Sequence, residues 1–356
     1  MTYERDIIRR MAGYVPGEQP SNADVIKLNT NENPWPPSPR VMQALTTISA
    51  EALRRYPSPG ATAVMEEAAT LHGVDHDQLV ATNGGDELLR LAITTFVPPG
   101  QPIGIAEPSY SLYPVLAAIH DSPVHRVALD SDWSPPADFA AAMNDAGVPL
   151  TLLVNPHAPS GHLLDADTIS ALAGDLQGVL LVDEAYVDFA DPDHDVTALV
   201  HRHDNLMILR TLSKGYSLAG LRLGYGIGPA GLIQPIATKT RDSYSVDAVA
   251  DHLGAAALAD QSSARASWRA VRDERDRLTQ ALRDAGFTVP DSQANFCLAS
   301  VPEGAAASAA QLYAALKDQG ILVRHFDTPR LRNDLRISIG TPAQNDALLA
   351  ALLPML

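Results

Sequence analysis

Short apolar runs alternate with helical segments between residues 79 and 228. The runs are QLVATN, PIGIAEP, VHRVAL, LTLLVNP, GVLLVDEAY, NLMILRTLS and RLGYGIG. Strands with consecutive apolar residues, separated by helices, are typical of a mostly parallel sheet that helices cover on both faces. The pattern therefore predicts an α/β fold built on one large sheet.

The two ends of the chain have different patterns. The first forty residues, which include KLNTNENPWPPSPR, are rich in Pro and Asn and predict an extended arm with turns. ASWRAVRDERDRLTQALRDAG predicts a long amphipathic helix that ends at Gly286, and shorter strands and helices follow it. We expect an arm over residues 1–40, a large domain over 41–250 and a small α+β domain over 251–356.

Several of the apolar runs end in polar side chains, namely Asn83, Glu107, Asn155, Asp183 and Ser213. Ligands of open α/β sheets bind at the carboxyl ends of the strands. Asp183 and Lys214 end neighbouring runs, so we expect them at the same edge, with Arg222 close by. Alone, each has an ordinary alternative, which is a solvated side chain at the end of a strand.

The segment ATNGGDELL predicts a tight turn into a helix that opens with Asp86 and Glu87. Free N–H groups at a helix N-terminus bind anions, and glycines let a phosphate approach closely. A plain strand-to-helix turn is the alternative. The chain lacks the G-x-x-x-x-G-K-[ST] and G-x-G-x-x-G patterns, which argues against a nucleoside triphosphate or a dinucleotide.

Together these residues predict a site for pyridoxal phosphate. A Schiff base requires an amine that can lose its proton, which lysine has and arginine lacks. The cofactor also needs a carboxylate on its ring nitrogen, and its phosphate needs a helix N-terminus, a hydroxyl and an arginine. Asp183, Lys214, the turn at 84–86, Ser213 and Arg222 supply one of each.

Composition narrows the classes of partner. A formal net charge of −16 over 356 residues argues against nucleic acid, because a phosphate backbone requires a basic protein face. No apolar run reaches the length that spans a bilayer, and the first residues lack a signal-peptide core. The single Cys297 excludes an intrachain disulfide, and the histidines show no metal-ligand spacing. We expect a cytoplasmic protein without metal, membrane or nucleic-acid binding.

Several motifs together resemble those of the fold-type I pyridoxal-phosphate-dependent aminotransferases, over nearly the whole chain. They are KLNTNENPWPPSP, RRYPSPG, NGGDELL, EPSYSLY, VDEAYVDF, RTLSKGYSLAGLRLGY and VRHF…LRISIGT. The last two are highly specific in combination, and the first favours the histidinol-phosphate branch of the family. The resemblance implies a large domain with a mostly parallel sheet, a smaller α+β domain, and an arm that contributes to the small domain and to the pocket.

The resemblance also implies roles for single residues. Lys214 would be the catalytic lysine that binds the cofactor and moves the proton, Asp183 would pair with the ring nitrogen, and Tyr186 would bond the 3′-oxygen. The other implied cofactor contacts are Gly85, Asp86, Tyr110, Asn155, Ser213, Arg222 and, across a homodimer, Tyr56. The implied substrate contacts are Tyr14, Asn33, Arg324 and Arg336. The implied reaction moves an amino group between glutamate or 2-oxoglutarate and histidinol phosphate or imidazole-acetol phosphate.

Three positions depart from the family's pattern. Ala158, in HAPSG, replaces the asparagine that usually contacts the 3′-oxygen, so Asn155 or His157 is expected to substitute for it. Asp247, in KTRDSYSVDAVA, adds an acid that we expect near the pocket of an anionic substrate. Pro37 stands where a glycine is common.

Several alternatives remain open. An aromatic amino-acid aminotransferase and a threonine-phosphate decarboxylase would use the same cofactor residues. A non-catalytic regulator that binds the cofactor is an alternative from another class, although such regulators normally carry a DNA-binding appendage. Without the motif, Tyr110 and Tyr113 would be read as core aromatics. An exposed ion pair is the alternative for the arginines of the C-terminal motif, Arg324 and Arg336, and it is the expectation for Arg330 and Arg332.

Overall fold

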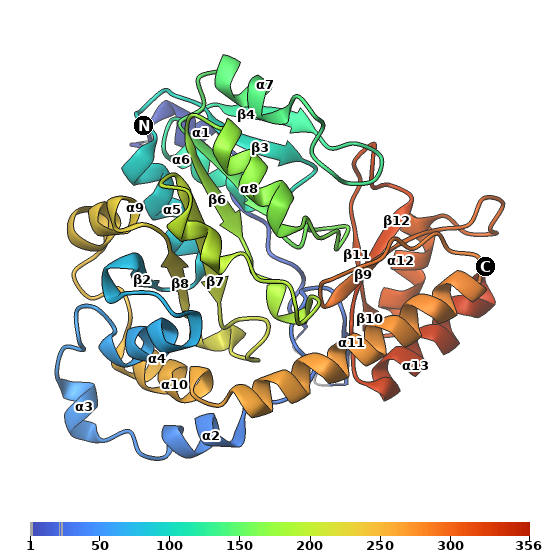
Figure 1. Cartoon of the computed structure of the whole chain (residues 1–356). Coiled ribbons are helices and arrows are strands. Elements are labelled where there is room, and N and C mark those ends of the chain that lie inside the picture. The colour runs from blue at the N-terminus through green and yellow to red at the C-terminus, as the bar shows by residue number, and fades with distance from the viewer. Residues whose placement is uncertain (1–2, 21, 23) are drawn as a thin grey trace.

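The computed structural model describes residues 3–20, 22 and 24–356. Within this part of the chain, seven strands form a central sheet in the order β2-β8-β7-β6-β5-β3-β4 (Figure 1). Their bounds are β2 Leu79–Thr82, β3 Ile103–Glu107, β4 Val124–Ala128, β5 Leu150–Val154, β6 Val179–Asp183, β7 Leu206–Thr211 and β8 Gly224–Ile227. β8 runs antiparallel to both neighbours and the other pairs are parallel. The predicted mostly parallel sheet is confirmed.

Helices cover both faces of this sheet, as continuous apolar strands require. One layer consists of α4 Thr62–His72, α7 Phe139–Asp145, α8 Ala166–Asp175 and α10 Ala248–Leu258, and the other of α5 Gly85–Phe96, α6 Leu112–Ile119 and α9 Ala230–Pro235. Successive strand residues face opposite layers. In β6, Leu180 and Val182 pack in the first core and Leu181 packs in the second.

Three short helices precede this unit: α1 Asp6–Arg10, α2 Pro39–Leu45 and α3 Ala50–Arg54. The start of α2 is explained by local residues. The Ser38 side chain accepts a hydrogen bond from the backbone N–H of Val41, and Pro39 occupies the first turn, where its missing N–H has no partner to lose.

The C-terminal part has its own core and its own sheet. Among the described residues, β9 Phe296–Ser300, β11 Arg324–His325 and β12 Asp334–Ser338 form an antiparallel sheet in the order β11-β12-β9. The helices beside it are α11 Gln261–Asp284, α12 Ala309–Asp318 and α13 Pro342–Leu352. The arm joins this part through β1 Ile26–Lys27, which pairs in parallel with β10 Ile321–Leu322. α11 runs from beneath the large sheet to the C-terminal helices (Figure 1).

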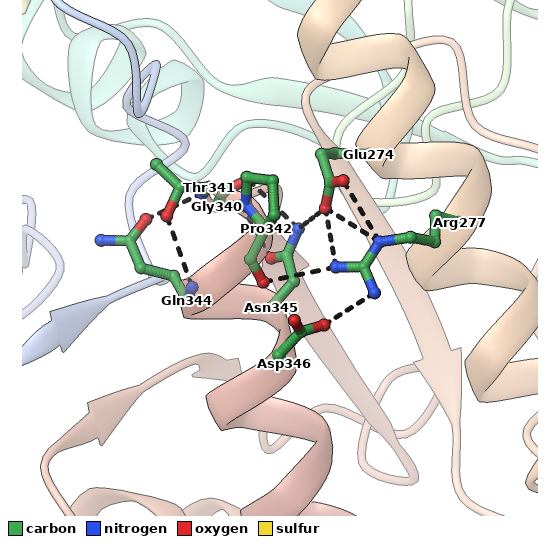
Figure 2. Close-up of polar contacts among 8 residues, drawn as sticks. All are labelled: Glu274, Arg277, Gly340, Thr341, Pro342, Gln344, Asn345 and Asp346. Atoms are coloured by element: carbon green, nitrogen blue, oxygen red, sulfur yellow. Dashed lines mark hydrogen bonds and ion pairs between the residues drawn. The ribbon is translucent and has the colours of Figure 1, made fainter.

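A polar cluster fastens α13 to α11 (Figure 2). Arg277 of α11 contacts Glu274 at 2.9 Å and Asp346 of α13 at 2.7 Å. Asn345, which is fully buried, donates to Glu274 at 2.9 Å and accepts from the backbone N–H of Gly340 at 3.0 Å. Because Gly340 lies just beyond β12, this cluster fixes the end of the strand that carries a predicted substrate arginine.

No helix in the described part of the chain has both the length and the apolar character needed to cross a membrane.

Candidate active site

A cavity of about 450 Å³ lies between the large sheet, the arm and the C-terminal strands. The predicted site residues that line it are Tyr14, Gly85, Asp86, Tyr110, Asp183, Tyr186, Ser213, Lys214, Arg222, Arg324 and Arg336. They come from segments up to 322 positions apart, which the fold brings together at the carboxyl ends of β6 and β7. A second hollow, of about 560 Å³ beside α8, contains none of them.

Asp183 ends β6 and its carboxylate is buried. The Tyr113 hydroxyl donates to Oδ2 at 2.8 Å, and the backbone N–H of Ala185 donates to Oδ1 at 3.1 Å. Burial raises the pKa of Asp183 to about 6, while these two hydrogen bonds act in the opposite direction because they stabilise the ionised form. The site therefore offers an oriented carboxylate that a cationic ring nitrogen would keep ionised.

Lys214 follows β7 and extends its amine into the cavity. Its Nζ donates to the backbone oxygen of Thr30 at 2.9 Å and lies 6.0 Å from the centre of the Tyr186 ring. Burial lowers the pKa of Lys214 to about 8, and the nearby guanidinium groups of Arg336 and Arg222 act in the same direction. A neutral amine, which nucleophilic and general-base chemistry require, is thus accessible near neutral pH.

The turn before α5 forms an anion cradle together with Arg222. Gly84 has a φ of +78°, which favours glycine, and a Cβ there would lie 2.9 Å from Arg222 Nη2, so a larger residue would displace the guanidinium. Arg222 also pairs with Asp86 at 3.1 Å, and Ser213 lines the same wall. Donors at a helix N-terminus, a hydroxyl and an arginine fit the phosphate of the predicted cofactor.

Aromatic side chains form another wall of the cavity. The Tyr110 hydroxyl donates to Asp86 at 3.4 Å, and the Tyr110 ring meets the rings of Tyr14 and Tyr113 edge-on at 6.0 and 5.5 Å. Burial raises the pKa of Tyr110, so the hydroxyl stays protonated. These contacts hold the ring at the cavity wall, as a stacking role for Tyr110 requires.

Two arginines of the C-terminal strands form a cationic region. Arg324 and Arg336 lie 5.3 and 5.5 Å from the centre of the Phe326 ring, and all three side chains line the cavity. Arg336 donates to the backbone oxygen of Asn29 at 3.0 Å, while its buried Nε has no partner among the described protein atoms. A partly buried guanidinium with a free donor, as in Arg336, is suited to an anionic substrate group. The structure thus excludes the surface ion-pair alternative for Arg336.

Three predicted site residues do not line the cavity. Asn33 donates to the backbone oxygen of Gly215 at 3.2 Å, so its amide is used for structure. The Asn155 side chain donates to and accepts from the backbone of Leu164, at 3.1 and 2.8 Å, so both polar atoms of its amide are used in this buried bridge. Tyr56 is 82% exposed on the outer surface, which leaves its predicted contact across a dimer open.

The structure shows where two of the three positions that depart from the family's pattern lie. Ala158 lines the cavity, whereas His157 is buried beside it and is bonded to the backbone oxygen of Pro108 and to Ser160 at 2.8 and 2.7 Å. Asp247, expected near the substrate, instead caps α10 by accepting from two backbone N–H groups. The extra acid therefore serves the helix.

Arg330 is not the surface ion-pair partner that we expected. Its guanidinium donates to the backbone oxygens of Leu129 at 2.5 Å and of Asp130, and it stacks over the Trp133 ring at 4.0 Å. Trp133 in turn stacks on His157. This contact connects the loop after β11 to the large sheet beside the cavity, and it uses backbone carbonyls, which no sequence pattern reveals.

Sequence reasoning missed four groups at this site. The Tyr113 hydroxyl bonds Asp183, the Asn31 amide donates to Tyr186 Oη at 3.1 Å, Phe326 separates the two arginines, and the Thr30 carbonyl accepts from Lys214. The sequence contains a partial signal for the first of these groups. A carboxylate at the end of a buried strand, such as Asp183, needs a hydrogen-bond partner, and Tyr113 supplies it. Within the described residues, no group of three or more His, Cys, Asp or Glu side chains could hold a metal ion.

Comparisons with known proteins agree with this geometry. A family model for class I and II aminotransferases matches residues 23–352. Histidinol-phosphate aminotransferase 1 of Trichormus variabilis is 42% identical over 356 residues, which is 99% of this chain and 99% of that protein. The histidinol-phosphate aminotransferase of Synechocystis sp. is 41% identical over 98% of this chain and 97% of that protein. The crystal structure of histidinol-phosphate aminotransferase from Sinorhizobium meliloti in complex with pyridoxal-5′-phosphate superposes with a TM-score of 0.91 at 26% identity, covering 100% of this chain and 98% of that one. The resemblance predicted from the motifs is confirmed.

Proposed function

Because the chain belongs to the class I and II aminotransferase family, we propose that it transfers an amino group between glutamate and imidazole-acetol phosphate, giving 2-oxoglutarate and histidinol phosphate, or the reverse. This reaction belongs to histidine biosynthesis. The observation that carries the proposal is one cavity that combines Asp183, Lys214 and Arg222 with the cationic region of Arg324 and Arg336. Full-length similarity to histidinol-phosphate aminotransferases supports the choice of substrate.

Pyridoxal phosphate is the cofactor that these residues fit. The turn at 84–86, Ser213 and Arg222 would hold its phosphate, and Asp183 would hold its ring nitrogen. When bound, the cofactor supplies an aldehyde that reacts with amines and a ring that accepts the electron pair left when a carbon loses its proton. Tyr113 keeps the Asp183 carboxylate oriented for this pairing.

Lys214 is the group that moves the proton. Its lowered pKa, about 8, gives a fraction of neutral amine at neutral pH, and the Thr30 carbonyl at 2.9 Å orients that amine without protonating it. A general base works best when its pKa is close to the working pH. Because the neutral form increases with pH, we expect proton transfer to become faster as the pH rises toward about 8.

The cationic region would bind the anionic end of each substrate. Arg324 and Arg336 can pair with the phosphate of histidinol phosphate or with the carboxylates of glutamate, since guanidinium groups bind both in a bidentate manner. Tyr14 lies 6.0 Å from Tyr110, on the wall where a substrate ring would enter. In a reaction with two successive half-reactions, glutamate and the phosphorylated substrate would occupy the cationic region one after the other.

We further propose that the active form is a homodimer located in the cytoplasm. Tyr56 stacks on Tyr244 at 4.6 Å, and both are exposed together with Met42, Leu45 and Leu53 on the neighbouring helices. We propose that these exposed side chains take part in the dimer contact, because exposed apolar surface favours association. The buried free thiol of Cys297 is compatible with a reducing compartment.

Half-reaction spectroscopy tests the function. Protein loaded with pyridoxal phosphate is mixed with glutamate and then with imidazole-acetol phosphate, and the absorbance of the cofactor is followed. We expect each addition to change the absorbance of all of the bound cofactor. The first addition should release 2-oxoglutarate and the second should release histidinol phosphate.

A faster reaction with phenylpyruvate would favour an aromatic aminotransferase, and release of CO2 from threonine phosphate would favour a decarboxylase. A Lys214→Arg variant keeps the charge but cannot form an imine, so any turnover by it would refute the role of Lys214.

A further inference from the structure

The peptide that follows Lys214 is held by two donors from distant parts of the chain. Trp268 Nε1, on α11, donates to the backbone oxygen of Gly215 at 2.8 Å. Asn33 Nδ2, on the arm, donates to the same oxygen at 3.2 Å. Gly215 is buried, and in the described part of the chain these two side chains are the donors to its carbonyl. Neither donor lines the cavity described above.

A buried carboxylate confines Gly215 from another direction. A Cβ at position 215 would lie 2.1 Å from Asp188 Oδ2, so the Asp188 side chain occupies the space that any other residue would need. Asp188 lies 3.9 Å from Arg210, and Arg210 pairs with Glu184 at 2.7 Å. Glu184 directly follows Asp183. This chain of charges therefore connects the backbone beside Lys214 to the strand end that carries the ring-nitrogen carboxylate.

The two donors are also joined to each other. Asn33 Nδ2 donates to Ser267 Oγ at 2.8 Å, and Ser267 precedes Trp268 on α11. The Trp268 ring packs against both the core of the large sheet and the core of the C-terminal part, and it meets the Tyr216 ring edge-on at 5.5 Å. Arm and α11 thus act as one unit at this point, and Trp268 contacts both halves of the molecule.

Resting on the proposed role of Lys214, we propose that Trp268 and Asn33 are positioning residues for the catalytic lysine. Through the Gly215 carbonyl they fix the backbone from which the lysine side chain extends. A shift of α11 relative to the large sheet moves this carbonyl and therefore moves the amine. The position of the C-terminal part, which carries Arg324 and Arg336, is in this way coupled to the position of the base.

The test compares Trp268→Phe with Trp35→Phe. The first variant removes the indole N–H that holds Gly215 and keeps an aromatic ring against Tyr216. The second makes the same substitution on the arm, where the Trp35 side chain packs against the C-terminal core. Only the Trp35 backbone N–H, which phenylalanine keeps, bonds Asn33 Oδ1, at 3.0 Å. Asn33→Ala removes the other donor and provides an independent variant should Trp268→Phe fold poorly. Melting temperature reports stability for all three.

Two measurements on cofactor-loaded protein separate positioning from stability. One is the single-turnover rate constant with glutamate, with the glutamate dissociation constant from the same data, and the other is the pH midpoint of the cofactor absorbance without substrate. For Trp268→Phe and for Asn33→Ala we expect the rate constant to fall about fivefold, the effect of one hydrogen bond, with the dissociation constant changed less than about twofold and the midpoint shifted. Trp35→Phe should have the wild-type rate constant, glutamate dissociation constant and pH midpoint.

A double variant that combines Trp268→Phe with Asn33→Ala tests whether the two donors act on the same carbonyl. Without both donors the buried carbonyl has no partner, so the loss in rate should exceed the product of the two single losses. If Trp268→Phe and Asn33→Ala lower only the melting temperature and leave rate and midpoint at the wild-type values, the positioning role is wrong while the proposed function stands. A wild-type protein that does not bind pyridoxal phosphate would overturn the proposed function and this inference with it.

Discussion

Replacing Tyr113 by Phe removes one hydroxyl from beneath the cofactor site and leaves the aromatic ring in the core. The hydroxyl donates to Asp183 Oδ2 at 2.8 Å, and Tyr113 is fully buried. After the change, the carboxylate keeps the hydrogen bond from the backbone N–H of Ala185 at 3.1 Å. The substitution therefore weakens the ionised form of Asp183 and leaves its neutral form nearly unaffected.

The size of the effect follows from the charge on the acceptor. A hydrogen bond to a charged group contributes about 1.5–3 kcal/mol, and one pKa unit corresponds to about 1.4 kcal/mol. Removing the hydroxyl should raise the pKa of Asp183 by roughly one to two units above its value of about 6. Only the ionised carboxylate can pair with a protonated ring nitrogen, so affinity for the cofactor is lost as the pH falls through this pKa.

The assay is the dissociation constant of pyridoxal phosphate between pH 5 and pH 7.5, measured by absorbance. Wild type should lose affinity below about pH 6, whereas Tyr113→Phe should already bind roughly 2- to 10-fold more weakly at pH 7. The matched control is Tyr225→Phe, which removes a buried hydroxyl that contacts His72 at 2.9 Å on the other face of the sheet. Equal pH midpoints for Tyr113→Phe and wild type would refute this reasoning.

Two further substitutions test the corrected residues. Arg330→Ala removes the contact with Trp133 and two backbone oxygens, so the loop that joins β11, which carries Arg324, to β12 should become less ordered. The KM for the phosphorylated substrate should rise about three- to tenfold, whereas Arg332→Ala, on the same loop, should keep the wild-type KM. Equal effects of the two changes would contradict this. Asp247→Ala removes the cap of α10 and should lower the free energy of unfolding in urea by about 1 kcal/mol. The substrate preference of Asp247→Ala should equal that of wild type, and a changed preference would indicate that Asp247 does affect substrate binding.

The sequence could predict those features that depend on strand ends. Buried parallel strands place the residues that follow them at one edge, and this rule brings Asp183 and Lys214 into one cavity. The Gly84 turn was predictable for a similar reason, because a glycine before an acidic helix start is a local signal. Fold class and cofactor chemistry follow from these few positions.

The rest depends on tertiary contacts that have no local signature. The arm has no hydrophobic period, so nothing in KLNTNENP distinguishes Asn31, which bonds Tyr186, from Asn33, which holds Gly215. The Asn155 amide bonds the backbone of Leu164, nine residues later. The rule that ligands bind at the ends of strands cannot distinguish such a structural side chain from a ligand contact. The Tyr113 hydroxyl has no signal of its own in the sequence, because the apolar face of α6 is sufficient to explain the burial of this ring.

The pairing of the arm with β10 has a consequence for the order in which the protein matures. Ile26 pairs with Ile321, so 295 residues of synthesis separate the two partners. At about 5–20 residues per second, the arm waits roughly 15 to 60 s on the ribosome before its strand can form. The large sheet, which ends at Ile227, is synthesised much earlier, so Lys214 and Gly215 can fold into place before the Thr30 carbonyl and the Asn33 amide, respectively, reach them. In a nascent chain the residue that we propose as the catalytic lysine therefore lacks these two arm contacts until β10 has been synthesised.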